Sequence, residues 1–345
     1  MKQELLRVEN LSKVFPLNGN RRLFQPRQFL KAVDDVSFQV YEGETLGVVG
    51  ESGCGKSTLG RMILRLLPPT SGKIYYDGQD LLAMPKKELR EKRQEMQIVF
   101  QDPYASLDPR MKIGDILAEP LLCHCHDLSL AERSERVAGL MEQVGLSPDY
   151  VSRFPHEFSG GQRQRIGIAR AIALNPRLIV CDEAVSALDV SVQAQILNLL
   201  VNLQEKYGLT YFFISHGLNV IRHISKQICV MYLGKIMEIG DADMLFRQRL
   251  HPYTKALFSA VPTIERIGDR SRIILQGDLP SPVSPPKGCR FHTRCPYKMQ
   301  ICTEVEPPAQ QVDEGYFVAC HLYGEKAAQA GDSALCDAKA SGGLA

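Results

Sequence analysis

Short, uninterrupted runs of apolar residues alternate with helix-like patterns along most of the chain. Three such runs lie at residues 45–49, 178–183 and 210–214, and the second ends in two carboxylates. Apolar runs of this length are typical of strands buried in a parallel sheet. Apolar residues recur at three- and four-residue steps over 57–67, which predicts a helix shortly after the first run. The pattern therefore predicts an α/β fold.

The remaining pattern separates a long first part from a small appendage. Apolar spacing predicts two further strands, at 5–14 and 36–40, and residues from about 102 to 157 are helical in pattern. From His251 onward proline is frequent, and the last stretch is rich in Ala and Gly without a core pattern. We expect three parts: a domain over 1–250, a loop-rich extension over 251–324 and a disordered tail over 325–345.

Composition restricts the class of protein. The 345 residues are 44% hydrophobic and 23% charged, as in ordinary water-soluble proteins. A net charge of +2 gives no basic field that would favour nucleic acid. No run of about 18 apolar residues is present and the first residues have no apolar signal core. We therefore expect a cytoplasmic chain that neither spans a membrane nor is secreted.

A glycine-rich loop follows the first apolar run and opens the predicted helix. Its sequence has the form G-x-x-x-x-G-K-S, and the residues are Gly50, Glu51, Ser52, Gly53, Cys54, Gly55, Lys56 and Ser57, with Thr58 next. Such a loop wraps phosphate oxygens with backbone N–H groups at the positive end of a helix. We expect Lys56 to reach the β- and γ-phosphates and the Ser57 hydroxyl to ligate Mg²⁺.

Two carboxylates at the end of the second run suit the same chemistry. Asp182 would lie at the tip of a strand and hold Mg²⁺ through water, because Mg²⁺ keeps several waters and takes few carboxylates. Glu183, one residue further, would lie close to a water that attacks the γ-phosphate. Alone, such a pair also fits a solvated strand end; with a phosphate loop in the same chain, a nucleotide site is the better interpretation.

A third motif identifies the kind of nucleotide-binding protein. Phe158-Ser159-Gly160-Gly161-Gln162 resembles the signature motif of ATP-binding cassette (ABC) proteins, with Phe158 where Leu is usual. Further resemblances follow in order, namely Gln101 to the Q-loop, Asp189 to the D-loop, His216 to the switch histidine and Phe15 to the aromatic residue that stacks on adenine. The resemblance implies a RecA-like core with an antiparallel β subdomain and a helical subdomain. It also implies that Glu183, His216, Lys56 and Gln101 are catalytic, that Gln101 joins Ser57 and Asp182 at Mg²⁺, and that Asp189 lies near the nucleotide.

The resemblance narrows to the ATPase subunits of bacterial oligopeptide and dipeptide importers. Residues 41–45, 101–110 and 155–159 look like theirs, and His251-Pro252-Tyr253 opens an extension typical of that group. Two positions depart from the family. Ala184 replaces the usual Pro after the catalytic Glu, and Gly217 replaces the Asp after the switch His. Neither departure removes a catalytic group, although the first removes a restraint on φ.

The resemblance also implies an assembly at the cytoplasmic face of the inner membrane. ATP would be held between this chain and a second, related ABC ATPase, because Ser159 and Gly161 of one subunit complete the phosphate site of the other. Two membrane permease subunits and, indirectly, an extracytoplasmic peptide-binding protein complete the complex, and no nucleic acid takes part. Importers of nickel or glutathione from the same branch, and soluble cassette ATPases outside transport, remain alternatives.

Four cysteines of the extension suggest a second site. Cys289, Cys295, Cys302 and Cys320 could hold Zn²⁺ or an iron–sulfur cluster, or could be reduced, buried thiols. Zinc ligands usually come as C-x₂₋₄-C pairs, and this spacing is wider. The similar stretch of some dipeptide importers is associated with a [4Fe–4S] cluster.

Overall fold

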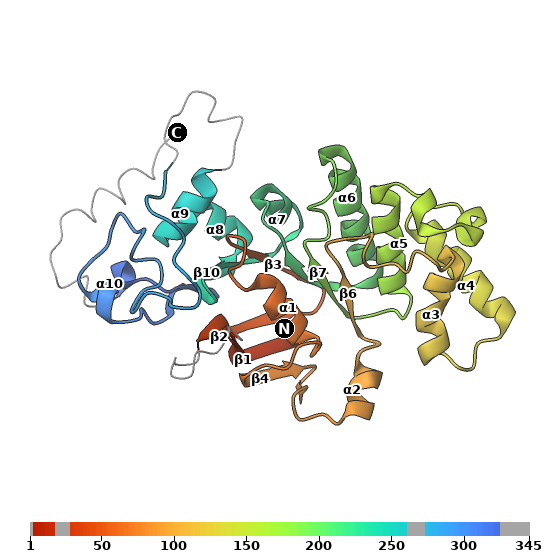
Figure 1. Cartoon of the computed structure of the whole chain (residues 1–345), viewed down its shortest axis with the longest axis horizontal. Helices are drawn as coiled ribbons and strands as arrows, with labels where there is room; N and C mark the ends of the chain where they lie inside the picture. Colours follow the sequence, from red (N-terminus) through yellow and green to blue (C-terminus); the bar gives the residue numbers. More distant parts are fainter. Residues whose placement is uncertain (1–2, 18–27, 261–272, 325–345) are drawn as a thin grey trace. The chain divides into compact units, whose positions relative to one another are not determined.

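The computed structural model describes residues 3–17, 28–260 and 273–324. The chain forms two compact units, Met1–Lys235 and Ile236–Ala345 (Figure 1). This division comes earlier than the expected domain boundary at residue 250. The expected disordered tail, 325–345, lies outside the described residues.

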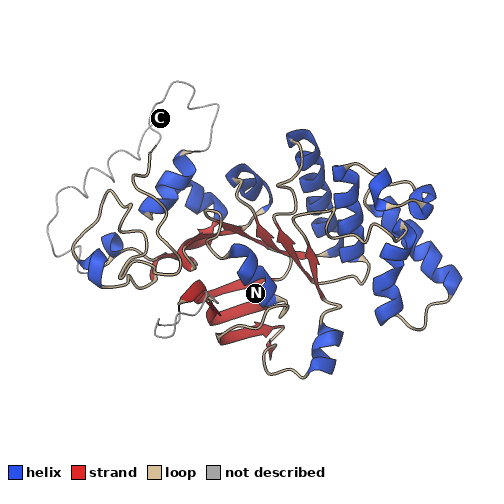
Figure 2. Cartoon of the chain, in the orientation of Figure 1, coloured by secondary structure: helices blue, strands red, loops and turns tan. Residues whose placement is uncertain are grey.

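A parallel sheet forms the centre of the first unit (Figure 2). Its strand order is β6 (Met96–Val99), β7 (Leu178–Asp182), β8 (Thr210–Ile214), β3 (Thr45–Val49) and β9 (Gln227–Tyr232). Every residue of β3, β7 and β8 is buried, as their uninterrupted apolar runs predict. Parallel strands end at the same edge, so the loops after β3, β7 and β8 meet there.

Helices cover the sheet and connect its strands. They are α1 (Lys56–Ile63), α5 (Gly160–Ile172), α6 (Val190–Tyr207) and α7 (Leu218–Ile224). Helix α1 packs closely on the sheet at Gly60, where a Cβ would lie 3.0 Å from Val180 and 3.1 Å from Ile214. This close packing fixes the start of α1, and with it the glycine-rich loop, against the strand ends.

A separate antiparallel sheet and a group of short helices complete the first unit. The sheet has the order β2 (Phe29–Tyr41), β1 (Glu4–Pro16), β4 (Ser71–Tyr76) and β5 (Gln79–Asp80), followed by α2 (Lys86–Lys92). Four helices follow β6, namely α3 (Ile113–His124), α4 (Leu130–Gln143), η1 (Pro148–Ser152) and η2 (Pro155–Glu157). Residues 102–112 form turns, so the helical segment is shorter than its pattern predicts.

The second unit joins a short sheet to several small helices. Its elements are β10 (Lys235–Asp241), which starts at the boundary, α8 (Ala242–Gln248), α9 (Pro252–Ser259), α10 (Ile301–Glu304), β11 (Gln310–Asp313), β12 (Tyr316–Val318) and η4 (His321–Tyr323). Strand β12 pairs antiparallel with both β10 and β11. A buried carboxylate, Glu238, accepts hydrogen bonds from the N–H groups of Leu250 (2.8 Å) and His251 (3.0 Å) and from the Tyr316 hydroxyl. It thereby ties β10 to the start of α9 and to β12.

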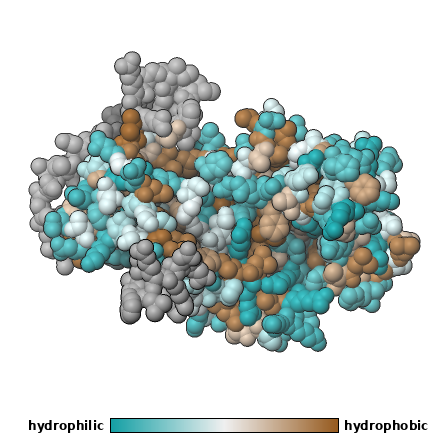
Figure 3. Space-filling model, viewed as in Figure 1, coloured by the Kyte–Doolittle hydropathy of each residue, from teal (hydrophilic) through white to brown (hydrophobic). Residues whose placement is uncertain are grey.

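The helices within residues 3–17, 28–260 and 273–324 include none with the length and apolar content of a membrane span. The face shown in Figure 3 mixes hydrophilic and apolar side chains.

Candidate nucleotide-binding site

The glycine-rich loop lies between β3 and α1, as predicted, and its glycines are required by geometry. Gly50, Gly53 and Gly55 have φ of 152°, 77° and 107°. A Cβ on Gly50 would lie 2.1 Å from the Met231 carbonyl oxygen, and one on Gly55 would lie 2.1 Å from the Ala32 carbonyl oxygen. Neighbouring backbone therefore touches the loop from behind, and only glycine fits at these two positions.

Lys56 is held inside this loop. Its Nζ donates to the carbonyl oxygens of Gly50 (2.8 Å) and Glu51 (3.0 Å), and the side chain is buried. Because Gly55 has no side chain to cap α1, the first N–H groups of the helix remain for an anion. Ser52 and Gly53 are exposed on the loop, and Thr58 lies in the first turn of α1. The loop thus presents an ammonium group and backbone donors at one place.

The two expected magnesium ligands of α1 and β7 lie in contact. Ser57 Oγ donates to Asp182 Oδ1 at 2.6 Å, and Asp182 is buried at the end of β7. Arg61, one turn after Ser57 on α1, places Nη2 3.8 Å from Asp182 Oδ2. The sequence interpretation missed Arg61, although its i+4 spacing from Ser57 puts both on one face of the helix.

Three expected catalytic residues also meet, each after a different strand. Gln101 Nε2 donates to Glu183 Oε2 at 2.9 Å, and His216 Nδ1 lies 3.7 Å from the same oxygen. Glu183 has φ of 49°, and its N–H donates to the Ile214 carbonyl oxygen at 3.1 Å. Strand β8 therefore holds the backbone of Glu183 in a left-handed turn that few non-glycine residues adopt.

Ala184 and Gly217, the two departures from the family pattern, lie beside Glu183 and His216. Ala184 is buried directly after the left-handed turn at Glu183. Gly217 donates its N–H to Ser215 Oγ at 3.0 Å, next to His216. A hydrogen bond thus fixes the backbone beside His216 without a carboxylate at 217.

The signature motif forms the start of α5. Ser159 Oγ accepts a hydrogen bond from the Gln162 N–H (3.3 Å), and Gln162 Oε1 accepts one from the Ser159 N–H (2.9 Å), which is a capping box. Ser159 and Gly160 are exposed. A Cβ on Gly161 would lie 2.4 Å from a Val192 methyl carbon on α6, so the helix start is closely packed.

The two remaining nucleotide-site residues lie at element ends. Phe15 is near the end of β1, half-buried, with Lys13 Nζ 5.1 Å from its ring centroid. Asp189 directly precedes α6 and is exposed. Their contacts with a nucleotide stay predictions.

The four cysteines of the extension come together within the second unit without forming a metal site among the described residues. Cys289, Cys302 and Cys320 are buried and Cys295 is half-buried, and the Cys289 N–H donates to the Cys302 carbonyl oxygen at 2.9 Å. Burial raises the pKa of the Cys289 thiol to about 11 and that of Cys320 to about 12. Across residues 3–17, 28–260 and 273–324, no three Cys, His, Asp or Glu side chains are arranged to hold a metal ion.

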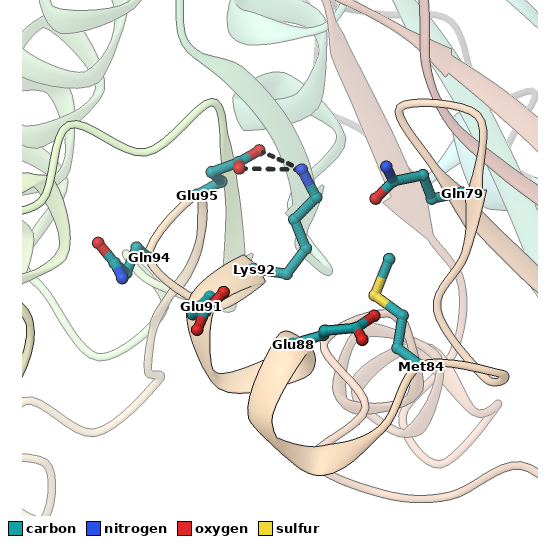
Figure 4. A pocket seen from close by; sticks show the side chains of 7 residues that line it. All are labelled: Gln79, Met84, Glu88, Glu91, Lys92, Gln94 and Glu95. Carbon is teal, nitrogen blue, oxygen red and sulfur yellow. Dashed lines mark hydrogen bonds and ion pairs between the residues drawn. The ribbon is translucent and has the colours of Figure 1, made fainter.

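A surface pocket of about 550 Å³ lies apart from all these residues, against α2. Figure 4 shows its lining, in which Lys92 Nζ contacts both carboxylate oxygens of Glu95, at 2.9 and 3.2 Å. None of the predicted site residues lines this pocket.

Comparison with known proteins agrees with this geometry. Residues 33–186 match the ABC transporter family, and residues 237–302 match the C-terminal region of oligopeptide/dipeptide transporters. The oligopeptide transport ATP-binding protein AppF of Bacillus subtilis is 53% identical over 93% of this chain and 98% of its own length. OppF of Salmonella typhimurium is 53% identical over 88% and 92%, and the dipeptide transport protein DppF of Escherichia coli is 49% identical over 93% and 95%.

Solved structures share the cassette fold. The dimeric post-hydrolysis structure of the ATP-binding cassette MJ0796, bound to ADP and Pi, is 28% identical, with a TM-score of 0.61 over 69% of this chain and 99% of that one. CbiO1 of Clostridium perfringens has the same fold, with a TM-score of 0.61 over 72% of this chain and 92% of that one.

Proposed function

Because the chain belongs to the ATP-binding subunits of oligopeptide and dipeptide ABC transporters, we propose that it hydrolyses ATP to drive peptide uptake. One observation carries the proposal for this chain's own residues. Gln101 and His216 both lie within 3.7 Å of Glu183 Oε2, and the three residues follow β6, β8 and β7 of the sheet whose β3 carries the phosphate loop.

Each of these groups has a role that its geometry supports. Lys56 and the N–H groups of the loop bind and orient the phosphates. Mg²⁺ neutralises phosphate charge when bound, and Ser57, Asp182 and Gln101 offer it oxygen ligands, of which Ser57 Oγ and Asp182 Oδ1 already lie 2.6 Å apart. Glu183 accepts the proton of the attacking water or orients that water, and His216, whose Nδ1 lies 3.7 Å from Glu183 Oε2, stabilises the γ-phosphate.

The proposed working unit is a dimer of ATPase subunits. The signature residues Ser159 and Gly161 start a helix whose N-terminus offers donors for a phosphate. In the proposed dimer they complete the site of the partner subunit, a second and related ATPase. The pair acts on two permease subunits at the cytoplasmic face of the inner membrane, supplied by an extracytoplasmic peptide-binding protein.

The experiment is a Glu183→Gln substitution in the assembled complex. The variant should bind ATP with unchanged affinity, while hydrolysis falls by a factor on the order of 10²–10³, typical for removal of one such group. Glu142→Gln, an exposed carboxylate on α4, is the matched control and should hydrolyse ATP like the wild type. Near-normal turnover by Glu183→Gln would refute the assigned role.

The solute and the complex require a separate test, because the ATPase subunit does not bind the solute. We expect the chain to co-purify with its permeases from membranes and to support uptake of labelled di- or oligopeptides in vesicles. Uptake of nickel or glutathione instead of peptides would show that the chain serves one of the other importers of this branch. A chain that hydrolyses ATP fully without membrane partners would be a soluble cassette ATPase.

An iron–sulfur cluster on the four cysteines stays a prediction, and its ligands are not assembled as a metal site in the described residues. No step of the proposed reaction passes through it. Anaerobic purification with iron and sulfide supplied decides the question. Brown protein with about four irons per chain supports a [4Fe–4S] cluster, whereas colourless, iron-free protein leaves four reduced, buried thiols.

A further inference from the structure

Helix α5 holds the segment that follows Gln101 at two points. The Arg163 guanidinium carbon lies 5.1 Å from the ring centroid of Tyr104, and Arg170 Nη1 donates to the Ser106 carbonyl oxygen at 2.7 Å. Positions 163 and 170 are seven residues, or about two helical turns, apart, so both side chains leave the same face of the helix. The same helix begins at the signature motif.

The segment held in this way is internally fixed. Asp102 Oδ1 accepts hydrogen bonds from the N–H groups of Tyr104 (2.8 Å) and Ala105 (3.2 Å), and the Asp102 carbonyl accepts one from the Ser106 N–H at 3.1 Å. These three hydrogen bonds connect Asp102, the residue after Gln101, directly to residues 104–106. A displacement of Gln101 is therefore passed to Tyr104 and Ser106 rather than absorbed between them.

Both arginines have few alternatives to these contacts. Burial lowers the pKa of the Arg170 guanidinium, while the negative charge of Glu119 opposes this effect. A buried guanidinium depends on its hydrogen bonds, because water does not replace them. Arg163 also donates from Nε to the Pro155 carbonyl oxygen at 2.8 Å, which anchors it just before the signature motif.

We propose that Arg163 and Arg170 are positioning residues that couple the segment after Gln101 to the signature motif at the start of α5. At one end Gln101 contacts Glu183 in this chain's own site. At the other end Ser159 and Gly161 are presented to the partner's site. Occupation of one site then sets the placement of the signature motif for the other. This inference rests on the proposed dimeric function.

The first arm of the test uses Arg170→Gln in the full complex. We expect the kcat for ATP hydrolysis to fall about tenfold or more, while KM and the ATP affinity of the isolated chain stay within about twofold. Arg170→Lys, which keeps a charged donor, should recover most of the rate. Arg136→Gln is the matched control: Arg136 Nη2 also donates to a carbonyl oxygen, that of Ala173 at 3.2 Å, but this contact does not involve the segment that follows Gln101. Its kcat should stay within about twofold of wild type.

The second arm asks whether Arg170 acts through the Gln101 segment. In a Gln101→Ala background, Arg170→Gln should lower kcat by a much smaller factor than it does in the wild type. The contact of Gln101 with Glu183, through which Arg170 would act, is already absent there. A residue with a merely structural role would give losses that multiply. Full multiplication, or a kcat of Arg170→Gln within about twofold of wild type, would overturn the inference.

Tyr104→Leu and Arg163→Gln form a third arm, at the contact between exposed Tyr104 and half-buried Arg163, which decides the matter if Arg170→Gln fails to fold. Each should lower kcat, and the double variant should be no slower than the slower single variant. If the two substitutions lower kcat independently, the proposed coupling through the Tyr104–Arg163 contact is wrong. A wild-type complex that fails to hydrolyse ATP would instead refute the proposed function, so the two failures are distinguishable.

Discussion

At the residue scale, His251 illustrates how a buried side chain makes stability depend on pH. Its Nδ1 accepts a hydrogen bond from the Tyr253 N–H at 3.0 Å, while Nε2 is buried without a hydrogen-bond partner among the described residues. Burial lowers the pKa of His251 to about 3, from 6.5. The folded unit therefore keeps His251 neutral where the unfolded chain protonates it.

The expected result is a loss of stability on acidification. As the pH falls through 6.5 the unfolded chain gains up to one proton more than the folded chain, so the loss of unfolding free energy steepens toward about 1.4 kcal/mol per pH unit and continues until about pH 3. His251→Asn keeps an oxygen that can accept from the Tyr253 N–H but does not titrate. Denaturant unfolding of both proteins from pH 7.5 to 5.5 measures the difference in slope. The comparison removes the contribution of Glu238, whose pKa is raised by burial and which is present in both. Equal slopes would contradict the prediction.

Two glycines of the phosphate loop provide a second test at this scale. Gly53 and Gly55 both have positive φ, but a Cβ on Gly53 meets nothing within 4 Å, whereas one on Gly55 would lie 2.1 Å from the Ala32 carbonyl oxygen. Gly53→Ala carries only the backbone cost, on the order of 1–2 kcal/mol. Gly55→Ala must also displace backbone. Titration with a fluorescent ATP analogue should show partial loss of affinity for Gly53→Ala and almost complete loss for Gly55→Ala. The reverse order of affinities would show that the backbone at Ala32 does not restrict the conformation of the loop.

Sequence reasoning singled out residues whose chemical type suits a nucleotide site. It missed residues whose importance comes only from contacts with distant parts of the chain. The loop at 50–57 and Asp182-Glu183 have residue types that follow from phosphate chemistry, and the resemblance to ABC proteins pointed to His216. Arg61 beside Asp182, and Tyr104 beside Arg163, belong to no such motif. Each pairing joins elements far apart in the chain, and only the packed structure brings them together.

At the element scale, the start of α5 serves two purposes that substitutions can separate. Ser159→Ala removes the side-chain cap and should lower the unfolding free energy by about 1 kcal/mol. Ser159→Asp keeps a capping oxygen, so stability should stay close to wild type, while the added negative charge repels the phosphate of the partner's nucleotide. Thermal unfolding and ATPase assays of the complex measure the two effects. An Asp variant that hydrolyses ATP at the wild-type rate would contradict a phosphate near Ser159.

Elements were predicted best where burial alone decides their pattern. The strands at 45–49 and 210–214 have the predicted bounds, since uninterrupted apolar runs leave little choice. Residues 102–112 were wrongly expected to be helical. There the Asx turn at Asp102 and the arginine contacts from α5 hold irregular backbone, and neither leaves a periodic signal.

At the scale of the whole molecule, the proposed composite site predicts that assembly controls activity. The isolated chain should bind ATP but hydrolyse it slowly, because its own loop lacks a signature motif from a partner. Addition of the second ATPase and the permeases should raise kcat strongly with little change in ATP affinity. Steady-state assays at increasing partner concentration would measure this. Full activity of a monomer, established by analytical ultracentrifugation, would exclude composite sites.

The strand order of the parallel sheet has a consequence for how the protein is made. Strand β3, which carries the phosphate loop, lies between β8 and β9, and the end of β9 at Tyr232 follows Val49 by 183 residues (232 minus 49). At about 5–20 residues per second, a ribosome needs roughly 10–40 s to supply those neighbours. During that interval the emerging chain already contains its phosphate-binding loop but not the two strands, β8 and β9, that flank β3. The nascent protein therefore becomes able to bind nucleotide late in its synthesis, well after the codons for Lys56 and Ser57 have been read.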